Sequence, residues 1–128
     1  MQKKGSHIFL DYQKIFMNYE ELNIITDKLF NFFHSLIRDN STMTIVHSYL
    51  HIFDKNISPA GFTCVLLLDE SHMTAHCYSD LGLLAIDLFT CGDTDTENLG
   101  NIIKEFISNE FSDSLLNQYS KIDRFIYN

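Results

Sequence analysis

One segment constrains the fold of this chain more than any other: a short apolar run that is followed by two acidic residues. Residues 62–68 read Phe-Thr-Cys-Val-Leu-Leu-Leu, a composition typical of a buried strand. A second strand-like segment, residues 72–78, begins after only three intervening residues. The sequence therefore predicts a β-hairpin whose turn is Asp69-Glu70-Ser71, with Ser71 at its tip.

The remaining segments alternate between helix and strand signals. Apolar side chains recur every three or four residues from 19 to 37 and again from 99 to 107, the spacing of amphipathic helices. Aromatic and β-branched residues indicate three further strands, at 8–12, 42–53 and 83–90. Residues 54–61 surround the only proline and are predicted to form a loop, whereas residues 109–128 show no regular pattern. The order β-α-β-β-β-β-α predicts an α+β fold, a two-layer sandwich with both helices on one face of an antiparallel sheet and a partner on the other face.

Composition narrows the classes of partner. The 128 residues suffice for one domain, and 45% hydrophobic with 20% charged residues is ordinary for a globular protein. A formal charge of −8 disfavours nucleic acid, whose phosphates need lysine and arginine, and suits a small cationic molecule. No apolar stretch approaches the ~20 residues of a membrane helix, so we expect no membrane partner. Cys64, Cys77 and Cys91 share no CxxC spacing and follow no apolar leader, which predicts a cytoplasmic location.

The residues around the predicted turn have an unusual spacing. Glu70-Ser71-His72 is followed by His76, by Asp80 and by Thr90-Cys91-Gly92. This pattern resembles that of the pyruvoyl-dependent S-adenosylmethionine decarboxylases, in their short bacterial and archaeal form. The resemblance spans roughly residues 5 to 107.

The resemblance implies that the chain is a proenzyme. The peptide bond before Ser71 would break, so that one domain consists of a β chain, residues 1–70, and an α chain, residues 71–128. Ser71 would become the pyruvoyl group that forms a Schiff base with the substrate. His76 is implied in processing, where it abstracts the proton that drives ester elimination, and Cys91 is implied as the proton donor after CO₂ leaves. Members of this length pair as homodimers of cleaved protomers, with sites completed across the interface.

Decarboxylation of an α-amino acid needs an electron sink, which explains why such a chain would modify itself. Pyridoxal phosphate is the common sink, but none of the lysines here lies beside a glycine-rich phosphate loop, and the chain is short for the usual folds. A ketone made from Ser71 serves the same purpose and requires no pyridoxal phosphate and no metal. Attack of the serine hydroxyl on the preceding carbonyl is easier in a tight turn, because the turn holds the two groups close together.

The resemblance also implies substrate contacts, with three departures from the family pattern. Glu70 and Asp80 would contact the ribose, although Asp80 replaces a glutamate and is one methylene shorter. Thr63 stands where the family usually has a serine that assists processing, and its hydroxyl can still form a hydrogen bond. The aromatic that stacks on the adenine is replaced by Ile57, unless an inserted loop lets Phe53 take this role.

Other interpretations remain open. A smaller cationic amino acid such as ornithine or arginine could replace S-adenosylmethionine as the substrate. A non-catalytic relative that regulates an active decarboxylase is a third possibility, against which the presence of Ser71, His76 and Cys91 argues. The spacing of His72 with His76, and of His47 with His51, suggests metal pairs only on a helix. In strands they have no third ligand, and we interpret both pairs as structural or solvated.

Overall fold

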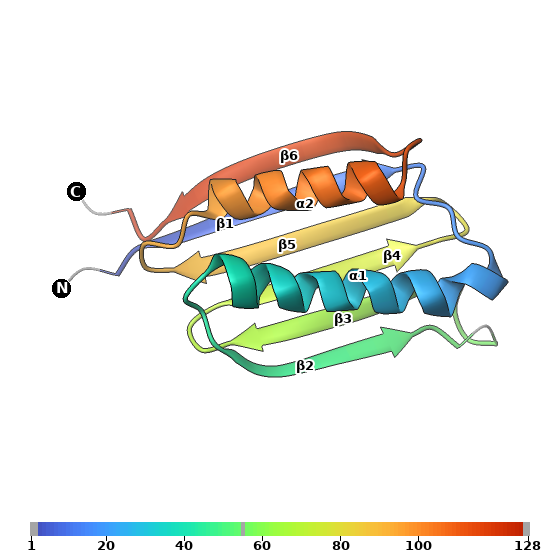
Figure 1. Cartoon of the computed structure of the whole chain (residues 1–128), viewed down its shortest axis with the longest axis horizontal. Coiled ribbons are helices and arrows are strands. Elements are labelled where there is room, and N and C mark those ends of the chain that lie inside the picture. Colours follow the sequence, from blue (N-terminus) through green and yellow to red (C-terminus); the bar gives the residue numbers. More distant parts are fainter. Residues whose placement is uncertain (1–2, 55, 127–128) are drawn as a thin grey trace.

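In the computed structural model, which describes residues 3–54 and 56–126, the predicted hairpin is formed by β3 (Gly61–Leu68) and β4 (His72–Tyr78). The hairpin belongs to a six-stranded sheet of order β2-β3-β4-β5-β1-β6 (Figure 1). The other strands are β1 (Gly5–Gln13), β2 (Ile45–Ile52), β5 (Leu83–Cys91) and β6 (Leu115–Arg124). Every neighbouring pair is antiparallel, which confirms the predicted α+β fold.

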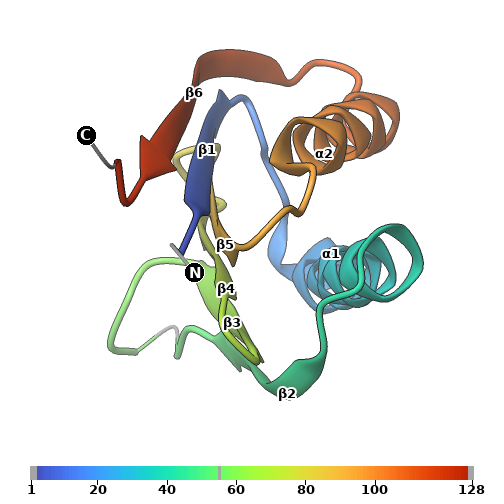
Figure 2. The same cartoon turned by 90° about the vertical axis from the view of Figure 1, so that its left-hand side faces the viewer.

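Two helices, α1 (Tyr19–Asn40) and α2 (Thr96–Glu110), cover the same face of the sheet, as Figure 2 shows. Each begins at a side-chain cap: Asn18 accepts a hydrogen bond from the Glu21 N–H, and Asp95 accepts one from the Asn98 N–H. The rings of Phe32 and Phe106 stack with centroids 3.8 Å apart and join the two helices. No helix in the described part of the chain is both long and apolar enough to cross a membrane.

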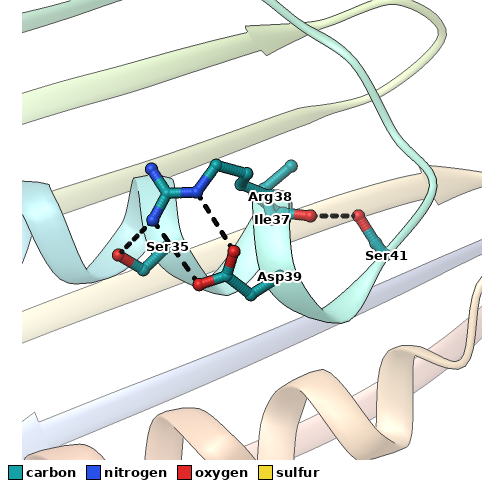
Figure 3. A network of polar contacts seen from close by, with 5 residues as sticks. All are labelled: Ser35, Ile37, Arg38, Asp39 and Ser41. Carbon is teal, nitrogen blue, oxygen red and sulfur yellow. Dashed lines mark hydrogen bonds and ion pairs between the residues drawn. The ribbon is translucent and has the colours of Figure 1, made fainter.

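The end of α1 differs from the prediction. The polar residues 38–40, expected to close the helix after residue 37, continue it to Asn40. Arg38 donates hydrogen bonds to Ser35 and Asp39 on the solvent side, so these polar side chains are satisfied without leaving the helix (Figure 3). The helix stops at Ser41, whose hydroxyl donates to the Ile37 carbonyl oxygen at 2.6 Å.

The core lies between the sheet and the helices, and its largest fully buried side chains include Phe33, Phe62 and Leu66. Alternate strand residues contribute to it, as the period of two requires. Gly61 begins β3 with a φ of +154°, and a Cβ there would overlap the carbonyl oxygen of Cys77. Only glycine therefore permits this close approach of β3 to β4.

We expect Phe33→Ala to lower the free energy of unfolding by about 3–5 kcal/mol, because it leaves a cavity in a close-packed core. Phe33 is fully buried, with an exposed fraction of 0%. Ile24→Ala, at a position of the same helix that is 72% exposed, is the matched control and should change stability by less than about 0.5 kcal/mol. Urea unfolding followed by circular dichroism measures both, and equal losses would contradict the assigned core.

The interpretation of residues 109–128 as irregular is wrong, because half of this segment forms β6 along the edge of β1. Tyr119 anchors it to α2, with Lys104 lying 3.6 Å from its ring centroid. Leu115 and Ile122 remain 48% and 46% exposed, so backbone pairing holds this strand more than apolar burial does. A hydrophobic period could not reveal such a strand.

The face of the sheet opposite the helices, here called the open face, is covered by no other element of the described chain (Figure 2). Residues that are paired across neighbouring strands have their side chains on the same face of the sheet. The residues of the open face can therefore be grouped into rows that run across the strands. One row contains His7, Phe89 and His72. Another contains Ala85, His76, Thr63 and His51, among others. The open face thus carries histidines and aromatics rather than a purely polar surface.

Candidate active site

The Ser71 turn, residues 68–71, has a two-residue loop, Asp69-Glu70, because Leu68 and Ser71 pair through their backbones. The prediction that Ser71 forms the tip is therefore wrong: Ser71 lies directly after the tip and is buried. The Leu68 N–H donates to the Ser71 carbonyl oxygen at 2.9 Å, and the Ser71 N–H returns a longer bond of 3.5 Å to the Leu68 carbonyl oxygen. The N–H of Asp69 donates to the carbonyl oxygen of Thr44 at 3.0 Å, which fastens the turn to the segment before β2. The peptide bond between Glu70 and Ser71 is therefore held at the end of the sheet on a short, fixed loop.

The Ser71 side chain is buried and oriented. Its exposed fraction is 8%, and its Oγ accepts a hydrogen bond from the backbone N–H of Cys91 at 3.0 Å. This contact joins β4 to the last residue of β5, so the sheet itself brings together two residues that are twenty positions apart in sequence. Because Oγ acts as an acceptor here, its own proton is available for transfer to a base.

Glu70 extends from the same turn towards the N-terminal segment. Its carboxylate lies 2.7 Å from the ammonium of Lys3, and the pair is exposed to solvent. The hydrogen bond with Glu70, together with its negative charge, raises the pKa of Lys3 above its usual value. Sequence reasoning missed Lys3, because only the pairing of β1 with β5 brings residue 3 to this end of the sheet.

Two cavities border the Ser71 turn. The first has a volume of about 560 Å³, lies against the end of α1 and the loop before α2, and carries four carboxylates: Asp69, Glu70, Asp93 and Asp95. The second, of about 430 Å³, includes Leu67, His72, Phe89 and Arg124 beside Ser71. Ser71 and Glu70 line both cavities, so a molecule in either one would lie next to the peptide bond between these two residues.

His76 does not lie beside Ser71 of its own chain. It is five residues further along β4, a separation of about 16 Å at the usual rise of a strand. His76 is paired instead with Thr63 on β3, and its Nδ1 is 2.9 Å from the Thr63 Oγ1. This pair faces out of the open face, where the register continues to His51 on β2.

The other predicted substrate residues lie at the opposite end of the sheet from Ser71. Asp80 is in the turn between β4 and β5, and Ile57, which is 82% exposed, is in the loop between β2 and β3. Phe53 packs near Tyr78, with ring centroids 6.1 Å apart. The structure therefore divides the predicted residues into the Ser71 turn with Cys91 and a distal group that consists of Thr63, His76, Asp80, Phe53 and Ile57.

The histidine pairs do not form metal sites within the described residues, where no group of three or more potential metal-binding side chains occurs. His72 stacks on Phe89 with centroids 5.6 Å apart and contributes to the second cavity. His47 and His51 are exposed on β2.

The three cysteines should differ in reactivity. Burial raises the pKa of Cys64 and of Cys77 to about 12, whereas Cys91 is partly exposed beside Ser71. Because the thiolate is the reactive form, iodoacetamide at neutral pH should modify Cys91 and leave the other two unmodified in the folded protein. Peptide mass mapping measures this, with urea-unfolded protein as the control in which all three react. Modification of Cys64 in the folded state would contradict the assigned burial.

The fold and the site together define a class of protein: a two-layer α/β sandwich in which a hairpin turn presents a buried serine next to a cysteine from the neighbouring strand. The family model described as S-adenosylmethionine decarboxylase matches residues 7–114, and the chain belongs to this family.

Similar proteins carry the same description. The S-adenosylmethionine decarboxylase proenzyme of Brevibacillus brevis is 44% identical over 45 residues, 35% of this chain and 34% of that protein. The proenzyme of Fervidobacterium nodosum is 46% identical over 50 residues, 39% of this chain and 34% of that protein. The matched segments thus span about a third of the length of these curated relatives. The crystal structure of the adenosylmethionine decarboxylase from Aquifex aeolicus VF5 has the same fold, with a TM-score of 0.62 at 20% identity over 100% of this chain and 96% of that one.

Proposed function

We propose that the chain is a cytoplasmic, pyruvoyl-dependent S-adenosylmethionine decarboxylase that cleaves itself between Glu70 and Ser71. The observation that carries this proposal is the hydrogen bond of 3.0 Å from the Cys91 N–H to the Ser71 Oγ, at a turn whose geometry is fixed by the sheet. It holds the hydroxyl of Ser71 in a defined position immediately after the carbonyl that it would attack. The product would supply aminopropyl groups for spermidine synthesis.

Processing starts from the Ser71 hydroxyl. Its Oγ attacks the carbonyl carbon of Glu70, the bond from that carbon to the Ser71 nitrogen breaks, and the hydroxyl proton passes to the freed amine, so that an ester replaces the amide. A base then removes the Cα proton of Ser71, and the Glu70 carboxylate leaves from Cβ, which ends the chain 1–70. Water replaces the nitrogen of the remaining dehydroalanine, and ammonia is released. Residues 71–128 then begin with a pyruvoyl group.

The residues around Ser71 fit such a group and its substrate. The pyruvoyl ketone would hold the substrate through its amine and accept the electron pair that stays on the substrate carbon when CO₂ leaves. Cys91, whose backbone N–H binds the Ser71 Oγ, would return a proton to the substrate carbon through its thiol. Of the four carboxylates of the first cavity, Glu70 and Asp93 are paired with Lys3 and Lys4, so Asp69 and Asp95 supply the excess negative charge that would favour a cation. S-adenosylmethionine carries a sulfonium in addition to its ammonium group.

The 16 Å separation of Ser71 and His76 supports a homodimer in which the open faces meet. A two-fold axis brings the same patch of both copies together. If the strands of one copy run opposite to those of the other, the distal group of one copy faces the Ser71 turn of its partner. His76 of the second copy would then act as the base in processing, assisted by its Thr63. Asp80 and either Phe53 or Ile57 of that copy would complete the ribose and adenine contacts, together with Glu70 of the first copy.

Release of CO₂ from substrates labelled at the carboxyl carbon tests the proposal. We expect purified, cleaved protein to release labelled CO₂ from S-adenosylmethionine and to leave ornithine and arginine intact. Release of CO₂ from ornithine or arginine alone would show that the substrate is a basic amino acid rather than S-adenosylmethionine. An intact chain with no release from any of the three would identify a non-catalytic relative.

A further inference from the structure

We propose that Arg124, at the end of β6, binds the α-carboxylate of the substrate and so makes this site selective for an amino acid over the amine that remains after CO₂ is lost. This inference rests on the proposed function and adds a residue from the C-terminal strand to the site. Arg124 lines the second cavity together with Glu70, Ser71 and His72. It belongs to the segment for which the sequence showed no pattern.

The strand register places Arg124 in the row of the reactive residues. Gly5 on β1 pairs with Cys91 on one side and with Arg124 on the other. Two strand spacings, about 10 Å between Cα atoms, therefore separate Arg124 from Cys91. An arginine side chain is long enough to cover most of this distance, and Arg124 shares the second cavity with Ser71, whose Oγ binds the Cys91 N–H.

Arg124 is exposed, and aromatic rings border one side of its guanidinium. Its guanidinium lies over the Phe89 ring, 5.3 Å from the centroid, and His72 stacks on the same ring. The next residue, Phe125, has a φ of +58° and directs its ring edge to Phe89. A Cβ at Gly5 would lie 3.1 Å from that ring, so the glycine leaves room for Phe125 to close over the end of β1.

The charges near Ser71 leave Arg124 available for an anion. Lys3 is bonded to Glu70, and Lys4 lies 3.8 Å from Asp93. Among the described residues no carboxylate lies within ion-pair distance of Arg124, in a chain with 17 acidic and 9 basic side chains. The aromatic ring beneath the guanidinium does not compete for its N–H donors in the way a carboxylate does. The planar guanidinium offers two parallel N–H donors, the arrangement that best matches the two oxygens of a carboxylate.

The chemistry of the reaction gives this contact a purpose. A substrate joined to residue 71 through its amine has its carboxylate one carbon away, inside the cavity that Arg124 lines. The product has lost that carboxylate and would lose the contact. Arg124 would therefore favour binding of the amino acid and release of the amine, rather than the chemical step itself.

Arg124→Gln tests the inference by comparing ligands with and without a carboxylate. We expect the KM for S-adenosylmethionine to rise roughly 10- to 100-fold with a smaller change in kcat, as for loss of a hydrogen bond to a charged group. The Kd of decarboxylated S-adenosylmethionine, measured by calorimetry, should stay within a factor of about two, because this ligand has nothing for Arg124 to bind. Arg124→Lys should recover part of the affinity for S-adenosylmethionine.

Lys121→Gln is the matched control, since it removes one positive charge from the same strand outside the cavity. It should leave both constants unchanged. Three results in Arg124→Gln would overturn the role of Arg124, provided that the wild type is cleaved and active. These are an unchanged KM for S-adenosylmethionine, an equal weakening of the binding of both ligands, and loss of the dimer. A wild type that neither cleaves nor releases CO₂ would instead overturn the proposed function, and with it the inference.

Discussion

Ser71→Ala is expected to leave the protein as a single chain of 14.9 kDa with no decarboxylase activity. The alanine has no hydroxyl to attack the Glu70 carbonyl, so neither the new chain end nor the ketone can form. The alanine also leaves the Cys91 N–H without its acceptor, so we expect a loss of about 1–3 kcal/mol in the free energy of unfolding but no loss of the fold. Denaturing gel electrophoresis and intact-mass measurement follow the cleavage, and labelled CO₂ follows the activity.

Ser112→Ala provides the matched control, since it removes a hydroxyl from an exposed turn far along the chain. It should be cleaved and active like the wild type. Cleavage of Ser71→Ala at the same bond would assign the reaction to another group or to a contaminating protease.

His76→Ala is expected to slow cleavage by about 10²–10⁴-fold, the usual contribution of a positioned acid or base. The distance of about 16 Å along β4 predicts in addition that this histidine serves the other copy. Coexpression of His76→Ala with Ser71→Ala should therefore restore cleavage. In the mixed dimer one copy supplies Ser71 and the other supplies His76, although alone His76→Ala is cleaved only slowly and Ser71→Ala is not cleaved.

His51→Ala is the control, because His51 lies in the same row of the open face, two strands from His76. It should be cleaved at the wild-type rate. Separately tagged chains identify which copy is cut: the copy with intact Ser71 should be the one that yields fragments. If mass measurement shows that the sample contains mixed dimers but no fragments appear, the proposal that His76 acts on the other copy is contradicted.

The sequence was informative where structure is local. The hairpin of β3 and β4 could be predicted because an apolar run, a short polar turn and a second strand adjoin one another, and the helices because their apolar residues repeat at the helical period. β6 could not be predicted, since Leu115 and Ile122 are about half exposed and the strand depends on the edge of β1, more than a hundred residues earlier. The backbone bonds that hold it leave no pattern in the side chains.

For the candidate site, the sequence suggested members but could not predict their arrangement. The spacing of Ser71, His76 and Cys91 suggested these residues through its resemblance to the family, and the contact between Ser71 and Cys91 follows from adjacent strands of one sheet. The separation of Ser71 from His76 follows from strand geometry, since residues five apart on one strand cannot meet. Lys3 and Arg124 had no signal, because only tertiary pairing with β1 brings the two ends of the chain to the Ser71 turn.

The central claim is that Ser71 ceases to be a serine, and the intact mass of freshly purified wild-type protein tests it most directly. We expect two chains, residues 1–70 and 71–128, with the second one lighter by one ammonia than a fragment that begins with serine and resistant to N-terminal degradation. A single unbroken chain, or a second fragment that begins with a free serine, would contradict the account.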